Sequence, residues 1–114
     1  MRRIVIITAK IRSKYAELIR NGAKTYEVRD ETFADAQAIH YIGQDDGADW
    51  GTYSIEKTFS LGREDDGKLI AYASIPADEF YELFPSTPNG GPERLWVAQI
   101  GARLDIESLI GGSH

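Results

Sequence analysis

Apolar residues recur along most of the chain at the spacing of β-strands. Residues 3–9 are β-branched and almost continuously apolar, a pattern that predicts a buried, central strand. Residues 52–61 alternate instead between an apolar and a polar face, as half-exposed antiparallel strands do. Residues 94–104 alternate in the same way. Three further strands are expected, over residues 24–30, 38–42 and 68–75.

Residues 13–21 have the spacing of a short helix that docks by one face. Their apolar residues fall at positions i, i+3 and i+4, which places them in one stripe. The stripe consists of Tyr15, Leu18 and Ile19. Ser13 is a suitable N-cap, because its hydroxyl can accept a hydrogen bond from a free amide of the first turn. Gly22 follows the last apolar position, where a residue that tolerates positive φ ends a helix most easily.

Turn-forming residues separate the remaining elements. Residues 62–67 are polar and glycine-bounded, which predicts a hairpin connection. A second short helix is expected after Asp78, and a final helical turn over residues 105–110. Residues 85–92 are rich in proline and glycine and are expected to form a mobile lid.

These elements add up to about six strands and two to three short helices. The pattern predicts an α+β domain around a small, mostly antiparallel β-barrel with flanking short helices. The length of 114 residues suits one domain, expected over residues 1–110, with 111–114 as a flexible tail.

Composition excludes several classes of protein. The chain has no cysteine, which removes disulfides and thiolate chemistry. Its histidines are His40 and His114, and the acidic residues 45–49 lack the ligand spacing of a calcium loop, so we expect no metal and no cofactor. No apolar run is long enough for a membrane span or a signal peptide, so a cytoplasmic protein without membrane association is expected.

Charge is distributed unevenly along the chain. Residues 1–29 hold eight basic and two acidic residues, a net charge of +6, whereas residues 30–114 hold five basic and sixteen acidic residues, a net charge of −11. A local basic surface on an acidic protein predicts an anionic partner. The candidate phosphate contacts are Arg12, Lys14 and Arg20. The alternative is that these charges are solvated faces of a strand and a helix.

Lys24, Glu27 and Arg29 are the best candidates for chemistry. A lysine beside a cleft can bind phosphate or, when desolvated, act as a base. Glu27 can transfer protons or accept the amino hydrogens of a nucleobase, and Arg29 can bind a phosphate through its guanidinium. Strand alternation places Lys24 on the opposite face from the other two, so either a bulge or the conformational freedom of the strand's first residue would be needed to bring all three together. The alternative is a surface Glu27–Arg29 pair with a solvated Lys24.

Four short motifs resemble those of a known family. They are Tyr-Ala-Glu-Leu-Ile at 15–19, Gly-Ala-Lys-Thr at 22–25, Glu-Val-Arg at 27–29 and Tyr-Ala-Ser-Ile-Pro at 72–76. Together they resemble the signature of the ASCH domain family, a branch of the PUA-like superfamily. The resemblance implies a PUA-like β-barrel with flanking helices, and binding of RNA or of modified nucleosides in a cleft beside the signature.

The resemblance also implies that catalysis is within the family's range. Relatives include an acetylcytidine amidohydrolase branch and members reported as ribonucleases. Lys24 matches the lysine of the amidohydrolase branch, and Glu27 stands where that branch has a threonine nucleophile. Thr25 is a threonine one position after Lys24.

The sequence therefore predicts an RNA- or nucleotide-binding ASCH-type domain with a basic cleft formed by the first helix and the following strand. The expected partner is RNA, a nucleotide or a nucleoside. The expected binding residues are Arg12, Lys14, Arg20, Lys24, Thr25, Glu27 and Arg29. One alternative is a hydrolase of the same family in which Lys24 and Glu27 are catalytic. Another is a regulatory protein-interaction module, and the sequence leaves the oligomeric state open.

Overall fold

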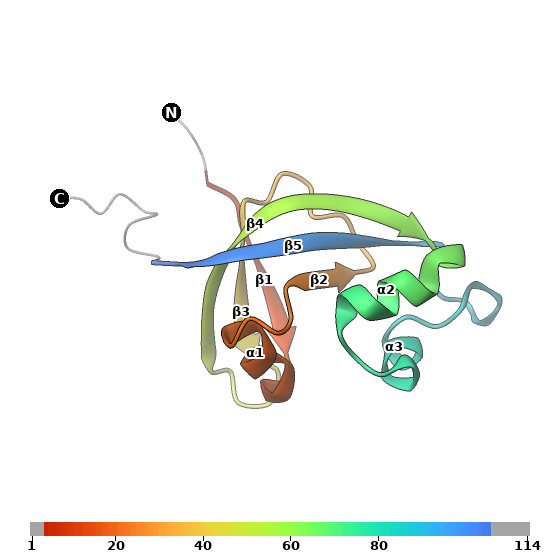
Figure 1. Cartoon of the computed structure of the whole chain (residues 1–114), viewed down its shortest axis with the longest axis horizontal. Helices are drawn as coiled ribbons and strands as arrows, with labels where there is room; N and C mark the ends of the chain where they lie inside the picture. The colour runs from red at the N-terminus through yellow and green to blue at the C-terminus, as the bar shows by residue number, and fades with distance from the viewer. Residues whose placement is uncertain (1–3, 106–114) are drawn as a thin grey trace.

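A five-stranded sheet carries three short α-helices on its concave side and at one end (Figure 1). The computed structural model describes residues 4–105. Its main elements are β1 (Ile6–Ile11), α1 (Ser13–Arg20), β2 (Tyr26–Arg29), β3 (Ala38–Gly43), β4 (Asp49–Gly62), α2 (Asp66–Ala73), α3 (Ala77–Leu83) and β5 (Arg94–Leu104). Short 3₁₀ helices lie at Arg63–Asp65 and Thr87–Asn89.

The sheet is mixed and strongly bent. Its strand order is β1-β3-β4-β5-β2, with β1 parallel to β3 and the other neighbours antiparallel. The pairing of β4 with β5 shifts register on both sides of Ile55, and such irregularities bend a strand and increase its twist. The long β4 therefore curves through both halves of the sheet (Figure 1). The protein is α+β with a mostly antiparallel half-barrel, which confirms the predicted fold class.

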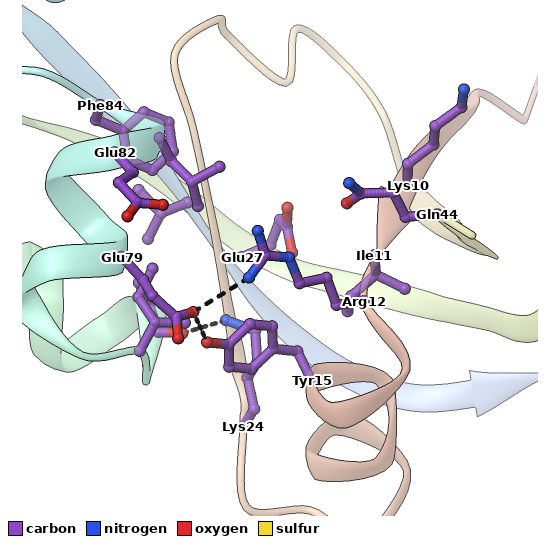
Figure 2. A pocket seen from close by; sticks show the side chains of 14 residues that line it. Lys10, Ile11, Arg12, Tyr15, Lys24, Glu27, Gln44, Glu79, Glu82 and Phe84 are labelled. Carbon is purple, nitrogen blue, oxygen red and sulfur yellow. Dashed lines mark hydrogen bonds and ion pairs between the residues drawn. The ribbon is translucent and has the colours of Figure 1, made fainter.

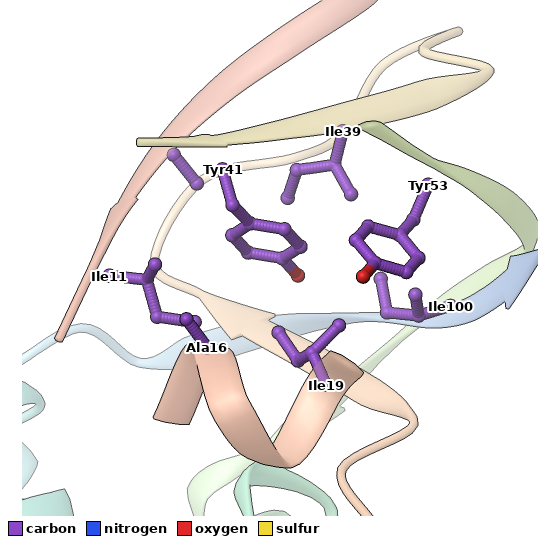
Figure 3. Packing of buried hydrophobic residues seen from close by; sticks show 8 residues of the cluster. Ile11, Ala16, Ile19, Ile39, Tyr41, Tyr53 and Ile100 are labelled. Carbon is purple, nitrogen blue, oxygen red and sulfur yellow. The ribbon is translucent and has the colours of Figure 1, made fainter. Parts of the chain in front are cut away.

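Two hydrophobic clusters fill the two ends of this sheet. The first lies between α1 and the sheet, where Ala16 and Ile19 face the two core tyrosines, Tyr41 and Tyr53 (Figure 3). The second lies beneath α2 and α3, and its largest fully buried side chain is Phe80. Strand β5 contributes to both clusters, and β2, which pairs with β5, contributes Val28 to the second.

The predicted strand over residues 68–75 is wrong, because this segment forms most of α2. Leu69 and Ala73 are buried and lie four residues apart, so the same apolar run also satisfies helical spacing. A short apolar run cannot be assigned by periodicity alone. The expected hairpin at 62–67 is wrong for the same reason: β4 ends at Gly62, and the 3₁₀ helix leads directly into α2. The chain thus has five described strands rather than six.

Two further expectations differ in detail. The first strand lies at an edge of the sheet and not at its centre, since β1 pairs with β3 alone among the described strands. Only Ala9 and Ile11 of β1 are buried, at alternate positions. Helix α1 begins at Ser13 itself, with Arg12 as the N-cap and without a capping side-chain hydrogen bond. Gly22 has φ +84°, which confirms the predicted helix stop.

The predicted second helix is confirmed as α3, which begins at Ala77 after Pro76. The predicted final helical turn and the tail lie, apart from Asp105, outside the described residues. Within residues 4–105, no helix has the length and apolar character needed to cross a membrane.

Arg63 fixes the proline- and glycine-rich segment that follows α3. Its guanidinium donates to both carboxylate oxygens of Asp66, at 2.7 and 3.2 Å. It also donates to the carbonyl oxygens of Phe84, Pro85 and Pro92, each at 2.8 Å. The segment is therefore held at both ends by one side chain that is only 8% exposed.

We expect Arg63→Ala to lower the free energy of unfolding by about 3 kcal/mol, because it leaves a nearly buried carboxylate and three carbonyls without their donor. Arg94→Ala is the matched control. Arg94 donates one exposed hydrogen bond to Ser60, so its loss should change stability by no more than about 0.5 kcal/mol. Urea unfolding followed by circular dichroism measures both. If Arg63→Ala lowers the free energy of unfolding by less than about 1 kcal/mol, Arg63 does not hold the 85–92 segment as described.

Candidate functional site

A cavity of about 130 Å³ opens between α1 on one side and α2 and α3 on the other (Figure 2). The end of β1 and the start of β2 form its floor. Its charged and hydroxyl-bearing side chains are Lys10, Arg12, Tyr15, Lys24, Glu27, Glu79 and Glu82. No residue of the 85–92 segment lines it, and the predicted lid stays a prediction. Arg63 ties this segment to the start of α2.

Lys24 is the most deeply buried charged side chain of the site. It is 6% exposed, and its Nζ donates to the carbonyl oxygen of Ala73 at 2.5 Å. Ala73 ends α2, where the last carbonyls have no partner within the helix, so the ammonium caps that end. Burial lowers the pKa of Lys24, and the neighbouring charge of Glu27 opposes this shift.

Glu27 lies on β2 and is held from the core. The hydroxyl of Tyr41 donates to its Oε1 at 3.0 Å, and Tyr41 is 1% exposed in the first hydrophobic cluster. Burial raises the pKa of Glu27, while Lys24, the Tyr41 hydrogen bond and Arg29 lower it. Burial of Tyr41, together with the charge and hydrogen bond of Glu27, raises the pKa of Tyr41 well above its usual value. Glu27 is thus a fixed carboxyl group with a weakened preference for its charged form.

Strand alternation does not separate Lys24 from Glu27, and of the two alternatives it is the freedom at the start of the strand, not a bulge, that applies. Strand β2 begins only at Tyr26, so Lys24 precedes the pleated segment. Its backbone amide instead donates to the carbonyl of Leu18 at the end of α1, at 2.9 Å. The turn at Gly22 sets this position, and it directs the lysine side chain into the cavity that Glu27 also lines.

Glu79 of α3 closes one side of the cavity mouth. Arg12 lies 3.7 Å from its Oε2, and the Tyr15 hydroxyl donates to the same oxygen (Figure 2). Lys14 donates to Oε1 of Glu79 at 3.0 Å. The hydrogen bonds from Tyr15 and Lys14 lower the pKa of Glu79. Burial and the bond to Glu79 raise the pKa of Tyr15, and the bond to Glu79 raises that of Lys14.

Three of the predicted binding residues lie away from the cavity. Arg20 pairs with Glu17 on the surface of α1, and its guanidinium lies 5.2 Å from the ring of Trp50. Thr25 is exposed, and its carbonyl accepts from the amide of Ile100.

Arg29 is the third. It pairs with Glu31 at 3.3 Å and lies 5.9 Å from the ring of Phe33. It reaches the site only through its charge, which lowers the pKa of Glu27. Of the seven predicted residues, the structure therefore brings Arg12, Lys24 and Glu27 into the cavity and places Lys14 at its mouth.

The cavity is not the basic cleft expected from the charge distribution. Helix α3 brings Glu79 and Glu82 into the cavity that Lys10, Arg12 and Lys24 also line, so cationic and anionic side chains balance. No pattern in the sequence indicates this arrangement, because both glutamates belong to the acidic part of the chain and only the tertiary fold places them here. Tyr15 lies in the apolar stripe of the first helix and Tyr41 in the strand predicted over residues 38–42, and neither pattern indicates the contacts of the hydroxyl groups. Within residues 4–105, no three acidic or histidine side chains gather as a metal site requires.

Replacement of Glu27 by glutamine should change how stability depends on pH. Because the pKa of Glu27 is raised above 4.5, the folded protein retains a proton that the unfolded chain releases, so stability falls as pH rises through this window. Glu27→Gln keeps an acceptor for the Tyr41 hydroxyl. Because its amide does not titrate, the stability of the variant does not fall in this way as pH rises. The variant should therefore gain stability relative to the parent as pH rises from about 4.5 towards 7.

Urea unfolding at several pH values tests this expectation. Glu93→Gln is the control, since Glu93 is an exposed carboxylate outside the cavity. Parallel stability profiles for the Glu27→Gln variant and the parent would refute the shifted pKa.

The fold has counterparts among solved structures. A variant of the ASCH protein from Zymomonas mobilis with a tyrosine replaced by phenylalanine superimposes with a TM-score of 0.68 at 16% identity, covering 90% of this chain and 71% of that one. The ASCH protein from Zymomonas mobilis itself gives a TM-score of 0.67 at 14% identity, over 86% and 68% of the two chains. No protein-family model and no curated protein matches the sequence. At these identities the likeness concerns the fold alone, and it confirms the fold that the motifs predicted: the chain has an ASCH-type fold.

Proposed function

We propose that this protein is an RNA- or nucleotide-binding ASCH-type domain that takes one nucleoside unit into the cavity between α1 and α3. The observation that carries the proposal is the convergence of two ionisable groups, the buried Lys24 and the partly buried Glu27, on one concave site beside Arg12. Perturbed ionisable groups in a cavity are the usual mark of a binding or catalytic site.

Each of these groups suits one part of a nucleotide. The carboxylate of Glu27 can accept the exocyclic amino hydrogens of a base, as acidic side chains do for cytosine. The ammonium of Lys24 can donate to a ring or sugar oxygen beside its bond to Ala73, since it has three donors. Arg12 at the mouth can contact phosphate.

The size of the cavity favours a single unit over a duplex. Its volume of about 130 Å³ is below the range of about 300–1,000 Å³ that is typical for drug-sized ligands. A nucleic acid would therefore enter through one unstacked base or through an end, as in most sequence-specific RNA recognition.

Lys24→Ala should weaken the binding of RNA and nucleotides by about tenfold or more, because a hydrogen bond from a charged donor is lost in a desolvated site. Fluorescence titrations with short single-stranded RNA and with mononucleotides measure this. Lys68→Ala removes the same charge from the exposed face of α2 and should have little effect. Equal affinities for the two variants would contradict the site, and affinity that is flat between low and moderate salt would contradict an electrostatic contribution to RNA binding.

A hydrolase acting at the same cavity is the second candidate. It is favoured by the opposite pKa shifts of Lys24 and Glu27, which move both groups towards neutrality and suit a general acid and base. Its substrates would be RNA or an acylated nucleoside.

If the protein is catalytic, Lys24→Ala and Glu27→Ala should each lower turnover by about a hundredfold or more with folding intact. Glu93→Ala is the control, and chromatographic product analysis on RNA and on a panel of acylated nucleosides is the measurement. Absence of turnover by the parent protein on all of them would exclude this candidate and leave the binding function in place.

A further inference from the structure

The carboxylate of Glu79 interacts with three side chains from one short segment of the chain, residues 12–15. Lys14 and Tyr15 donate to its two carboxylate oxygens, and Arg12 lies within ion-pair distance. Cations and a hydroxyl that converge on one point are also the usual means of binding a phosphate group. Here a carboxylate of the protein itself fills the point of convergence.

We infer that Arg12, Lys14 and Tyr15 form a subsite for a terminal phosphate, and that the Glu79 carboxylate occupies this subsite until a phosphate displaces it. The inference rests on the proposed function, because it assigns the phosphate position of the same ligand. Glu79 then has two effects: it holds α3 against α1, and it competes with the ligand.

A phosphate can displace the Glu79 carboxylate because it carries more negative charge and more acceptor atoms. A phosphomonoester carries about −1.5 to −2 charges at pH 7 and offers three free oxygens, whereas a carboxylate carries one charge and two oxygens. The existing ion pairs hold Glu79 weakly, because the side chains of Arg12 and Lys14 are 47% and 57% exposed.

Release of Glu79 does not require α3 to unfold. The helix is anchored by Phe80 and Phe84, which are buried in the second hydrophobic cluster on another side of α3. The Glu79 side chain is partly exposed, so a change of rotamer is enough to free the three donors.

The position of the subsite defines the class of ligand. Arg12 and Tyr15 line the same cavity as Lys24 and Glu27, so a base bound inside would have its phosphate at the mouth (Figure 2). The ligand is therefore a nucleoside with a terminal phosphate, either a mononucleotide or the phosphorylated end of an RNA chain.

Calorimetric titration of the full chain tests the inference with three kinds of probe: 5′-nucleoside monophosphates, the matching nucleosides and inorganic phosphate. Glu79→Gln removes the competing charge and keeps the shape of the side chain. It should tighten monophosphate binding by about fivefold or more and change nucleoside binding by less than about twofold. Adding Lys14→Ala to Glu79→Gln should cancel the gain.

Glu82→Gln is the matched control. Glu82 lies on the same helix and lines the same cavity, and none of the contacts described for residues 4–105 joins it to α1. It therefore reports the general effect of removing one negative charge. Thermal unfolding of each variant confirms that the fold is intact.

Where the parent protein binds monophosphates, an affinity that is unchanged or weaker in Glu79→Gln, or raised equally in Glu82→Gln, overturns the inference. If nucleosides and nucleotides still bind, the proposed function survives that result. A different outcome is that, of the three kinds of probe, inorganic phosphate alone binds Glu79→Gln. If adding Lys14→Ala abolishes that binding, the subsite is supported although no nucleotide binds. Only the proposed function is then contradicted.

Probes of different chain length distinguish the two sources of a terminal phosphate, a mononucleotide and an RNA end. Short RNA with and without a 5′- or 3′-phosphate is compared with the mononucleotides. A gain in Glu79→Gln that is confined to mononucleotides identifies a free nucleotide as the ligand, and a larger gain for phosphorylated RNA identifies a chain end.

Discussion

The buried ammonium of Lys24 joins the two halves of this protein. Its backbone is fixed to the end of α1, and its side chain reaches the last carbonyl of α2, so one residue connects the cluster beneath α1 with the cluster beneath α2 and α3. Burial of an ammonium is unfavourable unless charge and hydrogen bonds compensate for the lost water. The charge of Glu27 supplies part of this compensation, and Glu27 is itself desolvated and held by Tyr41. The site is therefore a place where the fold accepts a local loss of stability, as functional sites commonly do.

The two glutamates Glu27 and Glu79 line the same cavity but lie in different environments. Glu27 is fixed from the core, where burial disfavours its charge, and Glu79 is fixed at the surface by groups that favour its charge. The pKa values of the two carboxyl groups are thus moved apart although both line one cavity. Such a difference allows one group to act on uncharged parts of a ligand and the other to respond to its charge.

The elements with long, regular patterns could be predicted from the sequence, and the contacts between elements could not. Alternation over 52–61 and 94–104 identified β4 and β5, and Gly22 marked the end of α1, because these signals are local. The segment containing Leu69 and Ala73 satisfies both periods, so only its packing decides for a helix. The convergence of Lys24 with Glu27 depends on where β2 begins. The position of Glu79 depends on how α3 packs, which no spacing along the chain encodes.

The strand order has a consequence for the sequence of events during folding. Strand β2 enters the sheet through β5 alone among the described strands, and β5 is the last of them in the chain. Pairings this distant in sequence form late, because a long loop must close first. While the protein is synthesised, Glu27 therefore stays outside the sheet until residues 94–104 have left the ribosome. Desolvation of Lys24 and Glu27 therefore comes at the end of folding, when most other native contacts have formed and can compensate for it.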